Sequence, residues 1–180
     1  MKVRHVAPEA PAVDVADAAE HARVWEADET DALAALALTA TLELEAQASL
    51  ALLTRTVELR LTGWPASGKI RLPIGPVQDG ATATVTANGE PVIGAELLPG
   101  RHGELRLEAE TAALLSEAEI VITYPAGYGA TPGDVPADLR HAILDQVAAL
   151  YDARGAADPR RMTAAPAFLR IAARHRGARV

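Results

Sequence analysis

The segment Ile122-Thr-Tyr-Pro-Ala-Gly-Tyr-Gly129 is followed shortly afterwards by Val135-Pro-Ala-Asp-Leu-Arg-His-Ala-Ile143. Alternating residues at the start of the first segment predict a strand, and Gly127 and Gly129 predict a turn after it. Proline is tolerated in the first turn of a helix, so Pro136 predicts a helix start. A strand, a glycine turn and a helix in this order indicate a mixed α and β fold.

Two stretches near the N-terminus also have helical features. Asp14 can cap a helix over residues 15–25. Thr30 or Asp31 can open a second helix, and residues 32–53 contain no Gly or Pro, which predicts one long helix. After Pro136, a third helix ending near Gly155 is expected from one apolar stripe, formed by Leu139, Ile143, Val147 and Leu150.

Alternating apolar and polar residues between these helices predict an antiparallel sheet. Strands are expected at residues 57–61, 82–87, 90–93, 104–108 and 119–124. Asn88-Gly89 suits the positive φ angles of a tight hairpin turn. Residues 54–124 are therefore predicted to form one small antiparallel sheet.

The predicted fold class is α+β, in which N- and C-terminal helices form a body and a small antiparallel β-sheet is inserted between them. Residues 1–53 supply the N-terminal helices of the body, and residues 54–133 supply the inserted β region. Residues 134–159 supply the C-terminal body helix, and residues 160–180 form a basic C-terminal arm.

Composition and charge argue against large ligand pockets and bulk nucleic-acid binding. Hydrophobic residues make up 49% of the chain but aromatic residues only 3%, which suits close helix packing. The net charge is −7, with 3 basic and 10 acidic residues in 1–50, and 8 basic and 5 acidic residues in 134–180. Opposite charge at the two ends suggests different partners or attraction between neighbouring copies.

The sequence has few features that indicate a cellular compartment. The chain has no cysteine, so neither a disulfide framework nor a thiolate metal site is available. Residues 1–9 lack the apolar run of a signal peptide. The uncharged run at residues 32–42 is shorter than the roughly 20 residues that span a bilayer. We therefore expect a cytoplasmic protein without membrane contact.

The segment Gly63-Trp-Pro-Ala-Ser-Gly-Lys69 has the glycine and lysine spacing of a phosphate-binding loop. Ile70 follows, where such a loop needs Ser or Thr to hold magnesium, and the next residues are typical of an extended segment rather than a helix. A loop connecting two strands is favoured over a nucleotide site. A small nucleotide-binding enzyme remains an alternative.

The turn formed by Gly127, Tyr128 and Gly129 also joins a strand to a helix, as a dinucleotide cradle does. Its glycine spacing is wrong by one position, and Asp134 and Asp138 would repel a phosphate at the helix start. A structural turn is therefore favoured, in which the glycines supply backbone freedom.

Other chemical groups do not form a recognisable site in the sequence. His141 and Asp145 share a helix face at a spacing that can hold a metal, but without an evident third ligand a surface pair is favoured. None of the serines, Ser49, Ser67 and Ser116, lies in a nucleophile elbow. We therefore expect no catalytic, cofactor-binding or metal site, no cofactor, and no enzyme.

Several motifs in succession resemble the head-tail connector (adaptor) proteins of tailed phages, prophages and gene transfer agents. The resembling segments are Val15-Ala-Asp-Ala-Ala-Glu-His-Ala-Arg-Val24, Asp31-Ala-Leu33, Thr54-Arg-Thr56, Leu72-Pro-Ile-Gly-Pro-Val77 and the opening segment that ends at Gly129. Ala22 and Val57 depart from the family pattern, which usually has larger side chains there. The resemblance runs from Val15 to about Tyr151.

The resemblance implies a structural protein whose helices build a dodecameric ring beneath the portal, with the sheet projecting from it. Such a ring extends the DNA channel and provides the tail attachment site in the virion neck, after synthesis in the host cytoplasm. Its implied partners are the portal protein, neighbouring copies and a downstream stopper or tail protein, while DNA passes without specific binding. Another neck component, a stopper or tail-terminator, is the alternative.

Two surface predictions accompany this resemblance. The basic arm is expected to dock on the portal and to become ordered there, through Phe168, Leu169, Arg170, Arg174, Arg176 and Arg179. Glu43 and Glu45 are candidates for acidic residues that face the channel and repel passing DNA. Each of these segments could instead be an ordinary solvated tail or helix face.

Overall fold

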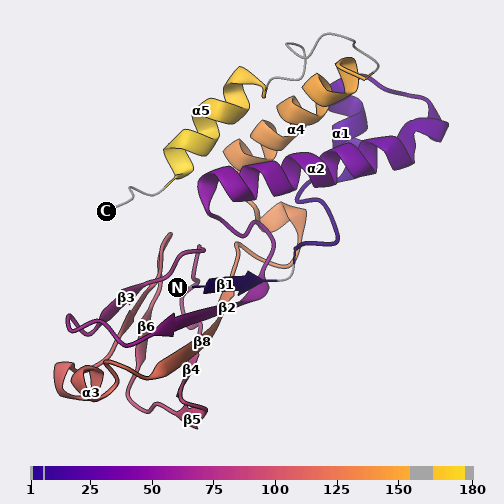
Figure 1. Cartoon of the computed structure of the whole chain (residues 1–180). Coiled ribbons are helices and arrows are strands. Elements are labelled where there is room, and N and C mark those ends of the chain that lie inside the picture. Colours follow the sequence, from indigo (N-terminus) through magenta and orange to yellow (C-terminus); the bar gives the residue numbers. More distant parts are fainter. Residues whose placement is uncertain (1, 6, 155–163, 177–180) are drawn as a thin grey trace. The chain divides into compact units, whose positions relative to one another are not determined.

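The computed structural model describes residues 2–5, 7–154 and 164–176. Contacts along the chain divide it into a sheet unit of residues 1–6 and 54–128 and a helical unit of residues 7–53 and 129–180 (Figure 1). The α+β fold class expected from the sequence is confirmed. The N-terminal boundary differs from the prediction, because residues 2–5 belong to the sheet unit rather than to the helical body.

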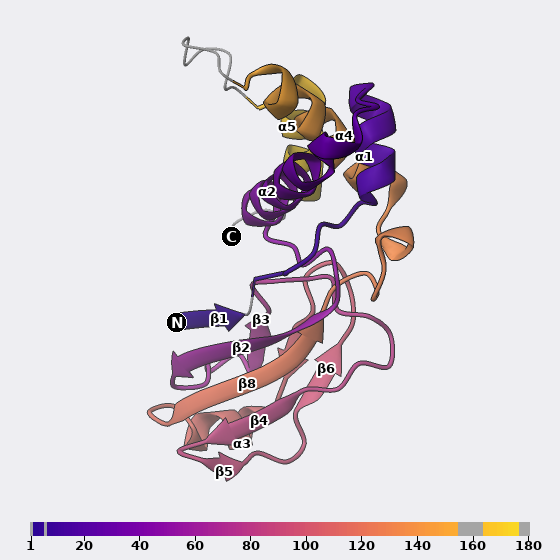
Figure 2. The same ribbon diagram turned by 90° about the vertical axis from the view of Figure 1, so that its right-hand side faces the viewer.

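The larger sheet of the sheet unit has five antiparallel strands, and Figure 2 shows them side by side. In spatial order the strands are β1 (Lys2–His5), β2 (Arg55–Thr62), β8 (Glu119–Ala126), β4 (Thr84–Ala87) and β5 (Glu90–Pro91). β1 was not predicted, since its pairing with β2 joins segments more than fifty positions apart. A four-residue strand offers little periodicity of its own.

The long pair β2 and β8 forms the centre of this sheet. Val57 lies opposite Tyr124 and Leu59 opposite Ile122, and all four side chains are buried. The Tyr124 hydroxyl donates to the Ile74 carbonyl at 3.1 Å. Burial raises the pKa of Tyr124 to about 12, so the phenol remains a proton donor at neutral pH.

The predicted hairpin between β4 and β5 is confirmed. Asn88 and Gly89 have φ angles of 50° and 87°, as a tight turn of this kind requires. Both strands are shorter than expected, and β5 ends at Pro91. Proline has no backbone N–H to donate, which limits the ladder at that point.

Three short strands form a second antiparallel sheet, in the order β3 (Lys69–Arg71), β7 (Glu104–Arg106) and β6 (Glu96–Leu98). The prediction of a single sheet was therefore wrong, because alternation identifies strands but not their partners. The sequence interpretation also missed α3 (Ala109–Leu114), a short helix. Its six residues are too few to show a helical period clearly.

The helical unit contains α1 (Val15–Ala22), α2 (Thr30–Ala48), α4 (Ala137–Asp152) and α5 (Pro166–His175), with short 3-10 turns η1 (Ala27–Glu29) and η2 (Pro132–Asp134). α4 packs against α1, α2 and α5, and α2 also packs against α1 and α5. The buried α2 residues include Leu33, Ala37, Ala40 and Leu44. Small alanines at helical spacing allow neighbouring helices to approach closely. Among the described residues, no helix is both long and apolar enough to cross a membrane.

Two helices end earlier than the sequence predicted. α1 stops at Ala22 because Arg23 adopts a left-handed conformation, with a φ angle of 57°. α2 stops at Ala48, where Ser49 has a φ angle of 56°. The apolar residues after it, Leu50, Ala51 and Leu52, are buried outside the helix. Burial rather than helical continuation therefore explains the apolar run beyond Ala48.

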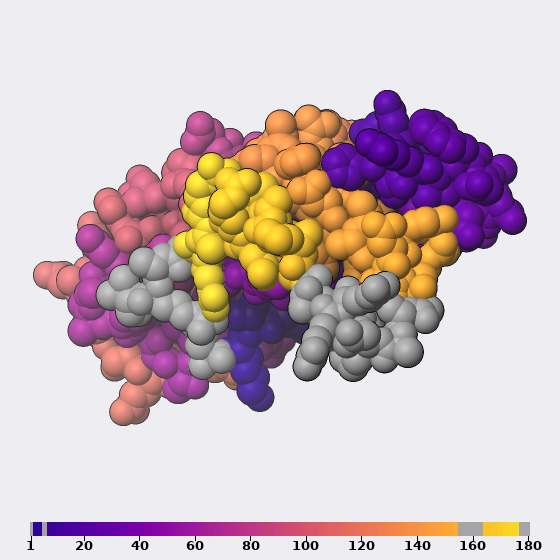
Figure 3. All heavy atoms as spheres, turned by 90° about the horizontal axis from the view of Figure 1, so that it is seen from above, coloured from indigo at the N-terminus to yellow at the C-terminus, as the bar shows by residue number. Residues whose placement is uncertain are grey.

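The C-terminal segment is an integral part of the helical unit within its described residues. α5 places Phe168 at 0% exposure and Ile171 at 3%, and it packs on α4 and α2. Its spheres adjoin those of α4 in Figure 3. The sequence predicted an arm that becomes ordered on the portal, whereas α5 packs within the chain itself because its apolar residues recur on one helical face.

Replacing Phe168 by Ala should lower the free energy of unfolding by about 3–5 kcal/mol, because it leaves a cavity in the helical unit. Urea denaturation followed by circular dichroism would measure the loss. Leu169→Ala is the matched control: Leu169 is 47% exposed, and its truncation should cost less than about 1 kcal/mol. Equal effects of the two substitutions would contradict the packing of α5.

Candidate functional site

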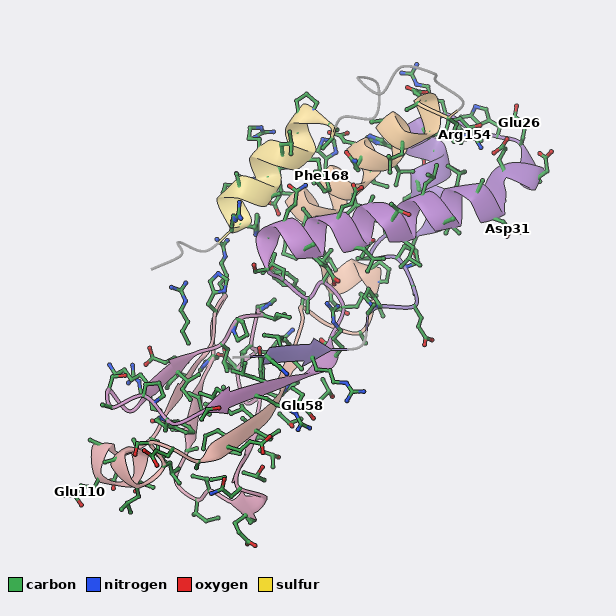
Figure 4. The ribbon with its side chains drawn as sticks, in the orientation of Figure 1. Glu26, Asp31, Glu58, Glu110, Arg154 and Phe168 are labelled. Atoms are coloured by element: carbon green, nitrogen blue, oxygen red, sulfur yellow. The ribbon has the colours of Figure 1, made fainter. Side chains whose placement is uncertain are left out.

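The predicted portal-binding residues separate into buried and exposed groups on α5. Figure 4 labels Phe168, which is fully buried in the helical unit. Leu169 and Arg170 are exposed, as is Arg176 after the end of the helix. Arg179 lies outside the described residues. The exposed residues of α5 therefore include the apolar Leu169 and the basic Arg170 and Arg174, and whether they contact a portal stays a prediction.

Asp138 fastens the last turn of α5 to the first turn of α4. Its Oδ2 accepts a hydrogen bond from His175 Nε2 at 2.7 Å and one from Arg174 Nη2 at 2.9 Å. Desolvation by burial acts to raise the pKa of the Asp138 carboxyl. The hydrogen bond and charge of His175, the Leu139 amide and Arg174 act in the opposite direction, and the pKa lies below its ordinary value.

Asp138→Asn should destabilise the protein at neutral pH by about 1 kcal/mol, since a charge-assisted hydrogen bond is lost at a partly exposed site. The folded-state pKa of Asp138 is depressed, so its contribution is present above the unfolded pKa of about 4. That contribution is lost as pH falls through the lower folded pKa. Urea denaturation of both proteins from pH 7 downwards should therefore show a difference that shrinks below about pH 4. A difference that persists unchanged at low pH would contradict this role.

The two predicted channel-facing carboxylates have different surroundings. Glu45 is 6% exposed, and its Oε1 accepts the Leu52 amide at 2.8 Å, so it serves the turn after α2. This burial is inconsistent with a channel-facing Glu45. Glu43 is half-buried, and its Oε2 accepts from Gln146 Nε2 on α4 at 2.9 Å.

Gln146 was not singled out in the sequence, yet it joins three parts of the helical unit. It is 2% exposed, and both ends of its amide have partners. Its nitrogen donates to Glu43, and its oxygen accepts the Ala165 amide at 2.8 Å, one residue before α5. A glutamine on an otherwise apolar helix face was the available signal, because a buried amide requires partners.

The glycine turn has a defined conformation and defined contacts, and its purely structural role stays a prediction. Gly127 has a φ angle of 142°, and its carbonyl accepts from Gln78 Nε2 at 2.8 Å. The carbonyl of Tyr128 accepts from the same nitrogen. A side chain on Gly129 would meet Asp134, with its Cβ 2.3 Å from the Asp134 Cβ. Pro136 is the N-cap of α4, so the helix begins at Ala137, one residue later than the sequence predicted.

The Asp134 side chain lies beside Gly129, in the turn that joins a strand to a helix as a dinucleotide cradle does. Its Oδ2 accepts from the backbone N and the Oγ1 of Thr131, each at 2.9 Å. These bonds lower the pKa of the Asp134 carboxyl, so it is ionised at neutral pH. The group beside Gly129 is therefore an anion that already binds the neighbouring amide.

The loop at residues 63–69 connects two strands, as predicted. The Gly68 amide donates to the Pro65 carbonyl at 2.9 Å, and Lys69 begins β3. A phosphate-binding loop directs helix amides at its ligand, whereas an extended strand follows here. The geometry therefore offers no support for nucleotide binding at this loop.

A third residue joins the pair formed by His141 and Asp145. His21, on α1, lies beside them, and the possible ligand atoms of all three residues are within 4.8 Å of one another. The expectation that the pair lacks a third ligand was wrong. His21 and Asp145 are 124 positions apart, so only the packing of α1 on α4 brings them together.

No protein-family model and no curated protein matches the chain. Solved structures match it over its whole length. A chain from the neck of an empty gene transfer agent particle, computed with C6 symmetry, is 26% identical with a TM-score of 0.77. A chain from the virion of a native gene transfer agent particle is 30% identical with a TM-score of 0.76. Each alignment covers 100% of this chain and 97% of the other.

A chain from the neck of a native gene transfer agent particle, computed with C12 symmetry, shares the fold at 23% identity and a TM-score of 0.73. The fold, together with the similarity to these chains over the full length, defines the protein as a structural component of a phage-like particle. The chain belongs to the phage-like neck proteins, the family represented by these gene transfer agent chains.

Proposed function

We propose that the protein is the head-tail connector (adaptor) of a phage or phage-like particle. Identical copies form a ring beneath the portal, extend the DNA channel and provide the attachment site for the tail. The observation that carries this proposal is the structural alignment with a chain from a gene transfer agent neck, which covers 97% of that chain. The motifs from Val15 to about Tyr151 add support, because they occur in the order of the adaptor family.

The symmetry of the matched particles supports the ring. Their necks were computed with C6 and C12 symmetry, and a chain in such an assembly is repeated around a closed axis. A dodecamer is compatible with the second symmetry. Neighbouring copies are therefore the first partners, and the portal and a downstream stopper or tail protein are the next.

Co-sedimentation of the protein with the portal ring of the same particle would test the proposal. The adaptor should bind the portal stoichiometrically, even if the purified chain is a monomer, because the portal can act as the template for the ring. Binding to a tail or stopper ring, with no binding to an intact portal, would instead identify another neck component. The stopper and tail-terminator alternatives would then replace the adaptor.

The outer face of α5 is the proposed portal contact. Leu169 is 47% exposed and lies beside Arg170, so one apolar side chain and one cation face outward together. Interfaces commonly depend on a few such residues. Removal of the whole segment after residue 159 is a poor test, because it would also remove Phe168 and Ile171 from the core.

The double variant Leu169→Asp/Arg170→Glu should weaken portal binding by at least about tenfold while preserving the fold, since both side chains are exposed. Quantitative co-sedimentation would measure the binding, and circular dichroism would check the fold. The matched control is Leu114→Asp on α3, where the leucine is 85% exposed in the sheet unit. Wild-type portal binding by the double variant would remove α5 from the interface.

Glu43 remains the candidate for a channel-facing carboxylate, together with exposed acidic residues near the start of α2. Figure 4 labels two of these, Glu26 and Asp31. A lumen that carries negative charge repels the phosphates of DNA and allows it to pass without specific binding. Charge reversal at Asp31 and Glu43 that leaves genome delivery normal would count against this role.

A further inference from the structure

His21, His141 and Asp145 form a compact group between two helices of the helical unit. His21 Nε2 lies 2.9 Å from Asp145 Oδ1, and His141 Nε2 lies 3.5 Å from Asp145 Oδ2. The two imidazole rings are 5.7 Å apart, in an edge-to-face arrangement. α1 supplies the first residue, and one face of α4 supplies the other two, which are four positions apart.

These three side chains have the chemistry of a transition-metal site. Imidazole nitrogen and carboxylate oxygen are both ligands of Zn²⁺, with bonds of about 2.0–2.2 Å. Neighbouring ligands in a tetrahedral zinc site are therefore roughly 3.3 Å apart. The 2.9 Å and 3.5 Å separations already bracket this value. His141 has 57% of its side chain exposed, so its ring can turn toward His21 to close the third edge.

The surface beside His21 is acidic and hollowed, which favours the approach of a cation. A surface hollow of about 410 Å³ adjoins His21, and it is lined also by Asp17, Glu20 and Leu144. The carboxylates of Asp17 and Glu20 line this hollow together with His21 and raise the local negative potential there.

We propose that His21, His141 and Asp145 bind one divalent transition-metal ion, with Zn²⁺ as the reference ion, and that the ion fastens α1 to α4. α1 is eight residues long and has a single buried residue, Ala18. Such a short helix depends on its tertiary contacts. A metal bridge would add a fixed link between segments 124 positions apart.

The polar contacts of the two histidines with Asp145 are the competing explanation. Each histidine lies near a different oxygen of Asp145, so the carboxylate could serve only to join two imidazoles. Hydrogen bonding alone predicts no response to added metal. A metal site predicts saturable binding that requires all three residues.

Isothermal titration calorimetry of the full chain, purified without a histidine tag, with ZnCl₂ tests the proposal. We expect one ion per chain, no comparable binding of MgCl₂, and an affinity reduced by about tenfold or more in His21→Gln, His141→Gln or Asp145→Asn. His102→Gln, in the sheet unit, is the matched control and should bind Zn²⁺ as the wild type does.

Two further readouts keep folding and binding apart. At about a hundredfold excess over the dissociation constant, Zn²⁺ should raise the Tm of the wild type by roughly 5 °C but not that of His141→Gln. Co²⁺ should give the visible absorption of a tetrahedral site in the wild type only. No binding of Zn²⁺, or binding that is equally tight in a folded His141→Gln variant, would overturn the proposal.

Discussion

Burial of the apolar face of α4 is the interaction on which the helical unit depends. Leu139, Ile143 and Val147 are each fully buried, and α4 packs against α1, α2 and α5. Helices of this length gain most of their stability from such packing rather than from intrinsic propensity. The proline and the glycine turn before α4 fix where this face begins.

The polar residues of α4 use the same central position to join the other helices. Asp138 holds the end of α5, Gln146 holds its start and also contacts Glu43 of α2, and Asp145 lies beside His21 of α1. Gln146 needs its partners because burial removes its amide from water, whereas Asp138 and Asp145 stay partly exposed. Their bonds therefore specify which helix lies where, while the apolar face supplies most of the stabilisation.

For a neck protein, this arrangement separates the functions of core and surface. The conformation of α5 is fixed internally by Phe168 and Asp138, so the exposed face with Leu169 can form a preorganised contact. Preorganisation lowers the entropic cost of association. In the sheet unit, the β2 and β8 pair forms the centre of the larger sheet.

Local patterns in the chain were sufficient for the α+β class, the Asn88-Gly89 hairpin and the helix after Pro136. Each of these depends on backbone preferences or on a short period. The same patterns placed the ends of α1 and α2 too late, because left-handed residues at Arg23 and Ser49 are set by the surrounding fold.

Contacts between residues that are distant in the sequence could not be predicted from these local patterns. Pairing of β1 with β2, the division into two sheets, the burial of Phe168 and Glu45, and the meeting of His21 with Asp145 all follow from packing. A periodic pattern reports which face of an element is apolar, but not which other element covers it. The partners of each face, and with them the candidate metal site, therefore depended on the tertiary structure.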